Sequence, residues 1–577
     1  MTGIPDQTTA TAILLRLSPD VFGLIGWGRQ GRCGWAHHHP LIENHFRANQ
    51  ANHHQVTQLK SMEGLPTLFK PVVRAILASL LLAQPATLRA ADLGADGPPG
   101  AKSPDARKQP PVASLAPYDF GNEPMRYLEN ARLKLGINLQ AGGAVTYLED
   151  KQLKSGNMIN SSDWGRQIQL SYYSGPVPFI GPNGEKPTPE WAGLGWNPIQ
   201  AGSVGRIASK TIAFEHGPDF LRARCVPMQW PHPNLPAECV FEATYRLVGG
   251  NAILMEARII NQRADHTQYP ARHQEMPALY TNGPWYRLVT YIGDHPRSGA
   301  VLATVVGKDD NKGWPWETFY APEHWAALVN DGGTGVGLFQ PDTCTMTGGF
   351  SGGDPLKGKG GPTDGQTGYL SPIARRILDH NMDWTYRTHI IVGSLDEIRD
   401  YARKQPPQRV SWEFASDRLG WVYENGKDAG WPIHDGLKVT YQKVPIGAMV
   451  SDAIYWAAEE APVLEIEASF ESGSGELELR SELVIQPFGL AERTDFPAWE
   501  PQDASQRAAN ETRHKDFPPA PAIVIPFPVQ GDGKMHIYAL KLSENPNYHG
   551  AMRQLRLNFP ATDGSADVRR ISLLRRP

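Results

Sequence analysis

The residues of this chain with the most chemical potential gather in residues 268–291, which read QYPARHQEMPALYTNGPWYRLVTY. Arg272, His273 and Glu275 stand there among aromatic residues that include Tyr280 and Trp285. Aromatic rings stack on the apolar faces of pyranose rings, while charged and polar side chains hydrogen-bond the sugar hydroxyls. The stretch therefore contains the residue types that a sugar site needs.

His273 and Glu275 are two residues apart, so on a strand both side chains point to one face. We interpret Glu275, set among aromatic rings, as a general acid/base with a raised pKa, and the face that it shares with His273 suits a joint site. The alternatives are a salt bridge from Glu275 to Arg272 or Arg287, and a hydrogen-bonded structural role for His273.

A glycoside hydrolase needs a second carboxylate, roughly 5–5.5 Å from the first in retaining enzymes and 6.5–9.5 Å in inverting ones. The candidates are Glu317 in the expected loop WPWETF, where tryptophans flank it, Glu323, and Asp379 in LDHNMD. Each also has a structural interpretation. A polysaccharide lyase would instead abstract a proton next to a uronate carboxylate, using a tyrosine or histidine together with an arginine or Ca²⁺ that neutralises the charge. The candidates for these roles are Tyr280, Tyr286, His380 and Arg287.

Further residues are candidates for contacts with sugar. Gln167, Gln169 and Ser171 alternate with apolar residues, which predicts a strand with a polar face that lines a cleft or meets water. The complete set of predicted substrate-binding residues is Arg166, Asn197, Gln200, Arg272, Tyr280, Trp285, Trp316 and His380.

Other chemistries lack their motifs. We find no phosphate-binding GxxxxGK[ST], no HExxH, no CxxC pair and no nucleophilic serine motif. Asp309, Asp310 and Asn311 are acidic enough for a structural Ca²⁺ but lack EF-hand spacing, so we expect a solvated loop, no metal site and no cofactor. The net charge of -4 and the lack of a basic stripe argue against nucleic acid as a partner.

The composition predicts an all-β protein. The chain has 57 glycines and 50 prolines in 577 residues, which indicates many turns and short strands. The one clear helix, over residues 395–404, starts at a capping box formed by Ser394 and Glu397. Pro406 and Pro407 end it and mark a boundary, after which residues 409–577 read as a second sandwich. A long glycine-rich loop is expected over residues 348–368.

The N-terminal part does not read as folded domain. Residues 1–61 show no sustained period and are interpreted as an unstructured extension or a mis-annotated start. Residues 62–91 resemble a signal peptide, with an apolar core AILASLLLA, and residues 92–117 form a linker. This predicts a secreted or periplasmic protein with no integral membrane segment after cleavage. In that setting Cys225 and Cys239, which flank a proline-rich connection, are expected to form a disulfide, with Cys344 free.

Two parts of the chain resemble known families. GINLQAGGAVTYLED, NMIN and DWGRQIQLSYY resemble the opening of galactose-mutarotase-like domains. The resemblance implies a large antiparallel β-supersandwich over residues 118–404, Arg166 as the sugar-binding arginine, and Glu275 with His273 as the acid/base pair. The spacing of His273 and Glu275 departs from the usual layout of that family. Residues 409–577 resemble jelly-roll modules that bind carbohydrate, by pattern alone.

These observations predict a carbohydrate-active enzyme whose partner is a polysaccharide or oligosaccharide. A glycoside hydrolase acting through carboxylate acid/base catalysis is the first hypothesis. A polysaccharide lyase that cleaves a uronate-containing polymer by β-elimination is the second, and a non-catalytic carbohydrate-binding protein is the third.

Overall fold

The computed structural model describes residues 111–293, 295–307, 316–354, 361–406, 410–443, 445, 447–471, 479–487 and 523–575. The predicted extension and signal peptide, most of the predicted linker, and residues 309–311 lie outside the described residues.

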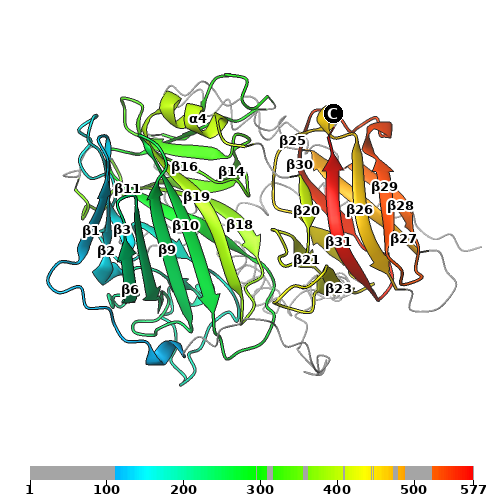
Figure 1. Ribbon diagram of the computed structural model, residues 1–577, viewed down its shortest axis with the longest axis horizontal. Coiled ribbons are helices and arrows are strands. Elements are labelled where there is room, and N and C mark those ends of the chain that lie inside the picture. Colours follow the sequence, from blue (N-terminus) through cyan, green and yellow to red (C-terminus); the bar gives the residue numbers. More distant parts are fainter. Residues whose placement is uncertain are drawn as a thin grey trace, which may run out of the picture. The chain divides into compact units, whose positions relative to one another are not determined.

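Antiparallel strands build four sheets, which confirms the predicted all-β class (Figure 1). The ten-stranded sheet has the main-path order β1-β2-β3-β4-β11-β18-β17-β14, with β5 and β8 attached beside β4. Its strands are β1 (Met125–Glu129), β2 (Leu133–Asn138), β3 (Ala144–Asp150), β4 (Ile168–Ser171), β5 (Pro198–Ile199), β8 (Met228–Gln229), β11 (Arg272–Asn282), β14 (Glu317–Tyr320), β17 (Thr345–Ser351) and β18 (Thr367–Arg376).

The nine-stranded sheet has the order β13-β12-β15-β16-β19-β10-β9-β7-β6, and its long strands β9, β10 and β19 run side by side in Figure 1. Its strands are β6 (Lys210–His216), β7 (Phe220–Val226), β9 (Cys239–Leu247), β10 (Ala252–Asn261), β12 (Arg287–Thr290), β13 (Ala303–Val306), β15 (Trp325–Val329), β16 (Thr334–Phe339) and β19 (Asp383–Ser394).

The alternation along β4 decides which face of the ten-stranded sheet is the core. Ile168 and Leu170 join the main apolar cluster, which also takes side chains from β9 and β10 of the other sheet. Gln169 and Ser171 point to the opposite face, as side chains alternate along a strand. Both are nevertheless buried, so this polar face is also covered.

Two expected loops are strands. The segment WPWETF was expected to be a loop, but β14 starts at Glu317 and pairs with β17. The expected loop over residues 348–368 is likewise wrong at both ends, because β17 and β18 occupy them. A Cβ atom on Gly348 would lie 2.6 Å from the carbonyl oxygen of Tyr369, so glycine here permits close strand packing and does not mark a turn.

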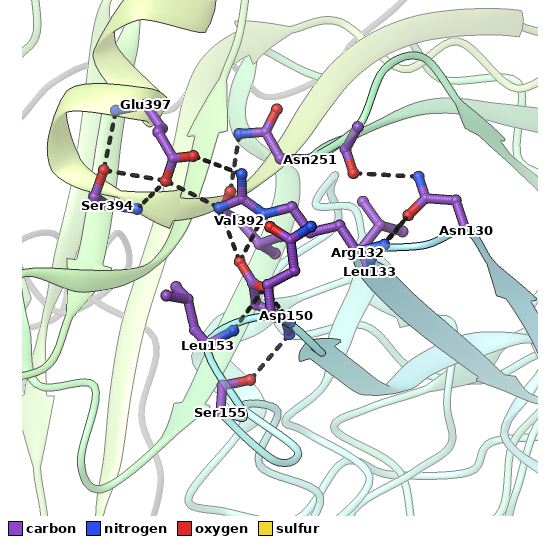
Figure 2. A network of polar contacts seen from close by, with 12 residues as sticks. Asn130, Arg132, Leu133, Asp150, Leu153, Ser155, Asn251, Val392, Ser394 and Glu397 are labelled. Atoms are coloured by element: carbon purple, nitrogen blue, oxygen red, sulfur yellow. Dashed lines mark hydrogen bonds and ion pairs between the residues drawn. The ribbon is translucent and has the colours of Figure 1, made fainter.

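The predicted helix is present as α4 (Leu395–Arg403), and both hydrogen bonds of the Ser394–Glu397 capping box form. Arg132 lies between the carboxylates of Glu397 and the buried Asp150, at 2.5 Å and 3.0 Å respectively (Figure 2). The network thereby connects the end of β19 with the β2–β3 hairpin. Within the described residues, no helix combines the length and apolarity needed to cross a membrane.

The chain after residue 410 forms two six-stranded sheets around a separate apolar cluster. One contains β20 (Ser411–Glu413), β22 (Gly426–Lys427), β23 (Leu437–Tyr441), β26 (Val463–Phe470), β29 (His536–Lys541) and β31 (Gly564–Leu574). The other contains β21 (Val422–Glu424), β24 (Ala448–Val450), β25 (Trp456–Ala457), β27 (Leu479–Pro487), β28 (Ile523–Val529) and β30 (Ala551–Asn558).

The predicted disulfide is wrong, because Cys225 and Cys239 are both buried free thiols, as is Cys344. Cys225 on β7 pairs with Phe241 on β9, which leaves Cys239 as a diagonal neighbour. Diagonal positions on a sheet are roughly 7–8 Å apart, beyond the Cα separation that a disulfide usually spans.

Candidate functional site

The candidate site centres on Glu275 in β11, on the face of the ten-stranded sheet that points away from the main core. Glu275 pairs with Ser171 of β4 on one side and Ile373 of β18 on the other. The register then shifts before Leu279. Because of this irregularity Tyr280, which pairs with Tyr369, falls on the same face as Glu275 although the two are five positions apart.

Two phenol groups hold the Glu275 carboxylate. Its Oε2 accepts a hydrogen bond from the hydroxyl of Tyr173 at 3.1 Å, and its Oε1 accepts one from the hydroxyl of Tyr369. The side chain of Glu275 is buried, with 1% exposure. A group that accepts two such bonds is suited to be a carboxylate, since a carboxylic acid would have to donate one.

Tyr173 is itself held in place. The side-chain amide of Gln274 accepts from the backbone N–H of Tyr173 at 2.7 Å and donates to its carbonyl at 2.9 Å. The hydroxyl of Ser171 donates to the phenol oxygen of Tyr173 at 3.0 Å. The polar face predicted for residues 167–171 therefore positions the partner of Glu275.

A group of aromatic rings lies beside the carboxylate. The ring of Tyr369 is 4.8 Å from that of Tyr280 and 4.9 Å from that of Trp316, measured between centroids. The indole N–H of Trp316 is buried, and within the described part of the chain it has no hydrogen-bond partner. We call Glu275, Tyr173, Tyr280, Tyr369 and Trp316 the Glu275 cluster.

The phenols of the cluster remain protonated at neutral pH. Burial, followed by the negative charge of Glu275, raises the pKa of Tyr173, Tyr280 and Tyr369 well above the usual value of 10.0. These hydroxyls are therefore hydrogen-bond and proton donors and not bases.

His273 shares the face of Glu275, as its spacing predicted. The two residues pair with Arg375 and Ile373, which are also two positions apart on β18. Burial, and then the charges of Arg375 and Arg272, lower the pKa of His273 to about 4. The imidazole is thus neutral at pH 7, so within the acid/base pair that the resemblance implied it is unsuited to be the acid and suited to a base or a hydrogen-bonding role.

Arg272 reaches back over the ring of Tyr173, with its guanidinium carbon 5.9 Å from the ring centroid. One guanidinium nitrogen donates to the backbone carbonyls of Ser174 at 3.0 Å and Leu194 at 2.7 Å. Burial lowers the pKa of this guanidinium. Within the described residues no carboxylate forms an ion pair with Arg272.

Arg166 lies close enough to Tyr280 that its charge lowers the pKa of that phenol against the effect of burial. Its guanidinium donates to Asn160 at 3.2 Å and to the backbone carbonyls of Asp364 and Gly365 at 3.2 Å and 3.1 Å. Arg166 also forms an ion pair with Asp163 at 3.5 Å. These bonds anchor a surface loop beside the cluster.

Asn197 and Gln200 hold the backbone around β4, next to the candidate site. Asn197 donates to the carbonyl of Tyr172 at 2.8 Å and to the hydroxyl of Ser171 at 3.5 Å. Gln200 accepts from the backbone N–H of Leu170 and donates to the carbonyl of Gly142, both at 3.1 Å. Both side chains are buried and fix the strand that carries Ser171.

Four predicted site residues are not brought to the cluster. Glu317 pairs with Gly348, whose other neighbour is Leu370, so the register places it on the opposite face from Tyr369. Asp379 is buried in an ion pair with Arg418 at 2.6 Å. The ring of His380 stacks on His266 at 4.0 Å, and Trp285 belongs to the main core.

The sequence analysis did not single out Tyr173 and Tyr369. Tyr173 follows a strand with a polar face, which is a signal that could have found it. Tyr369 adjoins the glycine-rich segment, and only the pairing of β18 with β11 brings it to Glu275. Among the described residues, no group of three or more histidine, cysteine, aspartate or glutamate side chains is arranged to hold a metal ion.

No protein-family model matches the chain, and no curated protein matches it. Comparison with solved structures finds a galactose mutarotase-like protein from Lactobacillus casei, at 13% identity and a TM-score of 0.31, covering 46% of this chain and 99% of that one. A galactose mutarotase related enzyme from Lactobacillus acidophilus has 10% identity and a TM-score of 0.30, covering 47% of this chain and 97% of the other.

A heparan sulfate lyase from Pedobacter heparinus is also similar, at 8% identity and a TM-score of 0.23, covering 56% of this chain and 41% of the lyase.

Proposed function

We propose that this protein is a carbohydrate-active enzyme that cleaves glycosidic bonds by acid–base catalysis at the Glu275 cluster. The observation that carries the proposal is the buried carboxylate of Glu275, which two phenol donors hold beside a group of aromatic rings. Buried charged groups are costly unless they are hydrogen-bonded, and they concentrate at functional sites.

Glu275 is the proton acceptor in this proposal. Its two tyrosine partners fix the carboxylate, which would take a proton from a water molecule or from the sugar. Ser171, Gln274 and Asn197 act as positioning residues, because they hold Tyr173 and the strand beneath it.

Tyr280 is the proton donor. Its hydroxyl makes no hydrogen bond of known geometry within the described residues, and its ring packs against Tyr369. The raised pKa of Tyr280 keeps the phenol protonated until a leaving oxygen needs the proton. Trp316 offers the cluster an aromatic surface and an indole N–H for a sugar.

Hydrolysis is the first form of this proposal, with Glu275 activating a water molecule that attacks the anomeric carbon. Elimination is the second, and a specific observation favours it. The neutral imidazole of His273 and the guanidinium of Arg272 stand beside Glu275 on β11, as a base and a positive charge for a uronate carboxylate.

The test is to incubate purified protein with a panel of neutral and acidic polysaccharides and to read reducing ends together with the absorbance of unsaturated sugars. Reducing ends without unsaturation support hydrolysis, and both together support elimination. If no polymer is cleaved while oligosaccharides still bind, the protein is a binding protein and the proposed catalysis is wrong.

A further inference from the structure

We infer that Arg272 and His273, with Arg375 across the strand pair, form an anion-binding subsite that takes the acidic group of a charged sugar unit next to Glu275. This inference rests on the proposed function for its choice of ligand, but it concerns binding and is tested as such.

Basic side chains are concentrated at one end of two paired strands. β11 and β18 pair Arg272 with Arg376 and His273 with Arg375. Three guanidiniums and an imidazole therefore come from four positions at neighbouring points of the sheet. Like charges set opposite one another destabilise a sheet, so such a grouping needs a compensating negative charge or a function.

Negative charge from the protein compensates some of these groups. Arg376 forms an ion pair with Asp452 at 2.7 Å, and Arg375 forms one with Glu424 at 3.3 Å. Glu424 is shared with Arg556, so this carboxylate faces two guanidiniums. Arg272 has only backbone carbonyls and the ring of Tyr173 as contacts of known geometry.

The guanidinium of Arg272 is held in one orientation. The two carbonyl bonds use a single guanidinium nitrogen, Nη1. Loop residue Gly195 leaves room for it, since a Cβ atom there would lie 2.9 Å from that nitrogen. The guanidinium is thus held in place while its other two nitrogens keep their hydrogen-bonding capacity, and a planar guanidinium binds a carboxylate through two parallel bonds.

The proposed subsite lies close to Glu275, the residue to which we assign the proton transfer. Arg272 lies over Tyr173, and the hydroxyl of Tyr173 bonds to Glu275 at 3.1 Å. His273 shares the face of Glu275, and within the described residues neither of its ring nitrogens has a hydrogen-bond partner. The positive charges of Arg375 and Arg272 both act on His273. An anionic group held by Arg272 beside Tyr173 would therefore belong to a sugar unit at or beside the unit on which Glu275 acts.

The ligand class is an acidic sugar, whose anion is either the carboxylate of a uronate or a sulfate ester. Both have oxygen atoms that accept from guanidinium and imidazole N–H groups. A uronate carboxylate is planar and matches the fork of Arg272, so we commit to a uronate-containing polymer. Sulfated sugars are a separate arm of the test.

The test is a set of calorimetric titrations with a galacturonate oligomer, the same oligomer after reduction of its carboxyl groups, and a sulfated galactan oligomer. The proteins are the parent, Arg272→Met, Arg272→Lys and His273→Gln. Arg387→Met is the matched control, because Arg387 on β19 forms an exposed ion pair with Glu256 on β10. Both strands belong to the nine-stranded sheet, whereas β11 belongs to the ten-stranded one. Thermal unfolding of each variant checks that it is folded.

We expect the parent to bind the galacturonate oligomer about tenfold to hundredfold more tightly than its reduced form, as a charge-assisted hydrogen bond allows. Arg272→Met should remove this preference, and Arg272→Lys and His273→Gln should reduce it. Arg387→Met should retain it.

Equal affinity for the acidic and reduced oligomers, or a preference that survives in Arg272→Met, would overturn the subsite. A preference for the sulfated oligomer alone would overturn the choice of uronate. The proposed function fails separately: if the parent binds galacturonate through Arg272 and cleaves no polymer, the subsite stands and the catalysis does not. If the parent cleaves only neutral polymers and shows no preference for galacturonate, the catalysis stands and the subsite does not.

Discussion

The hydroxyl of Tyr173 lies 3.1 Å from the Oε2 atom of Glu275, and these two residues are 102 positions apart in the chain. The strand pairing of β4 with β11 brings them together, and Gln274 fixes the backbone of Tyr173 from the neighbouring position. This relationship makes Glu275 a buried acceptor of phenol hydrogen bonds, and several expectations follow from it.

Replacing Glu275 with glutamine should lower kcat by about 10²–10⁴, the typical contribution of general acid–base catalysis. The amide can still accept a hydrogen bond from Tyr173, so binding of oligosaccharide should change little. Initial rates and calorimetric affinities measure the two effects. A variant that cleaves polymer at close to the parent rate would show that Glu275 has a structural role only.

Replacing Tyr280 with phenylalanine should keep the ring packed against Tyr369 and remove the proton that we assign to the leaving oxygen. We expect kcat to fall at least about tenfold while KM changes little, because the loss concerns the transition state. Tyr147→Phe is the control, since the Tyr147 hydroxyl bonds to Glu149 on β3 and makes no contact with the cluster. Equal losses in both variants would contradict the role of Tyr280.

The sequence predicted the strand over residues 167–171 because apolar and polar residues alternate there, and β4 (Ile168–Ser171) is that strand. It also predicted the capping box of α4, which depends on neighbouring residues alone. It did not predict β14 and β17, because their glycine and tryptophan residues read as loop signals and only close strand packing explains them.

For the candidate site, the sequence placed Glu275, His273 and Arg272 on one strand but could not supply their partners. Tyr173 and Tyr369 come from strands on either side of β11, and pairing between distant strands is not encoded in local periodicity. The register shift after Glu275 is a further obstacle, because strict alternation would put Tyr280 on the wrong face. Glu317 lies outside the cluster for a related reason. It follows Trp316 directly, so its side chain points to the opposite face.

The three described cysteines should behave as unreactive thiols in the folded protein. Burial raises the pKa of Cys344 to about 12 and also raises those of Cys225 and Cys239. The thiolate is the reactive form, so a soluble alkylating reagent at pH 8 should modify these residues only after unfolding. Peptide mapping without reductant checks the result, and a linked Cys225–Cys239 peptide would contradict it.

The Arg132–Glu397 network should make a pH-dependent contribution to stability (Figure 2). The hydrogen bond from Arg132 is the main reason that the pKa of Glu397 falls from 4.5 to about 2. The folded-state pKa is therefore below the unfolded one, so the contribution is complete above about pH 5 and is lost as the pH falls through about 2.

The Glu397 side chain is 42% exposed, which reduces the size of the effect. We expect Glu397→Gln to lower the free energy of unfolding by about 1 kcal/mol at pH 7, since the ion pair weakens and the cap loses its charge. At about pH 2 the variant and the parent should be equally stable. Urea unfolding at both pH values measures this, with Glu129→Gln as a control because Glu129 forms an exposed pair with Lys151. A difference that persists unchanged at the lower pH would mean that Glu397 stabilises the fold through packing and not through its charge.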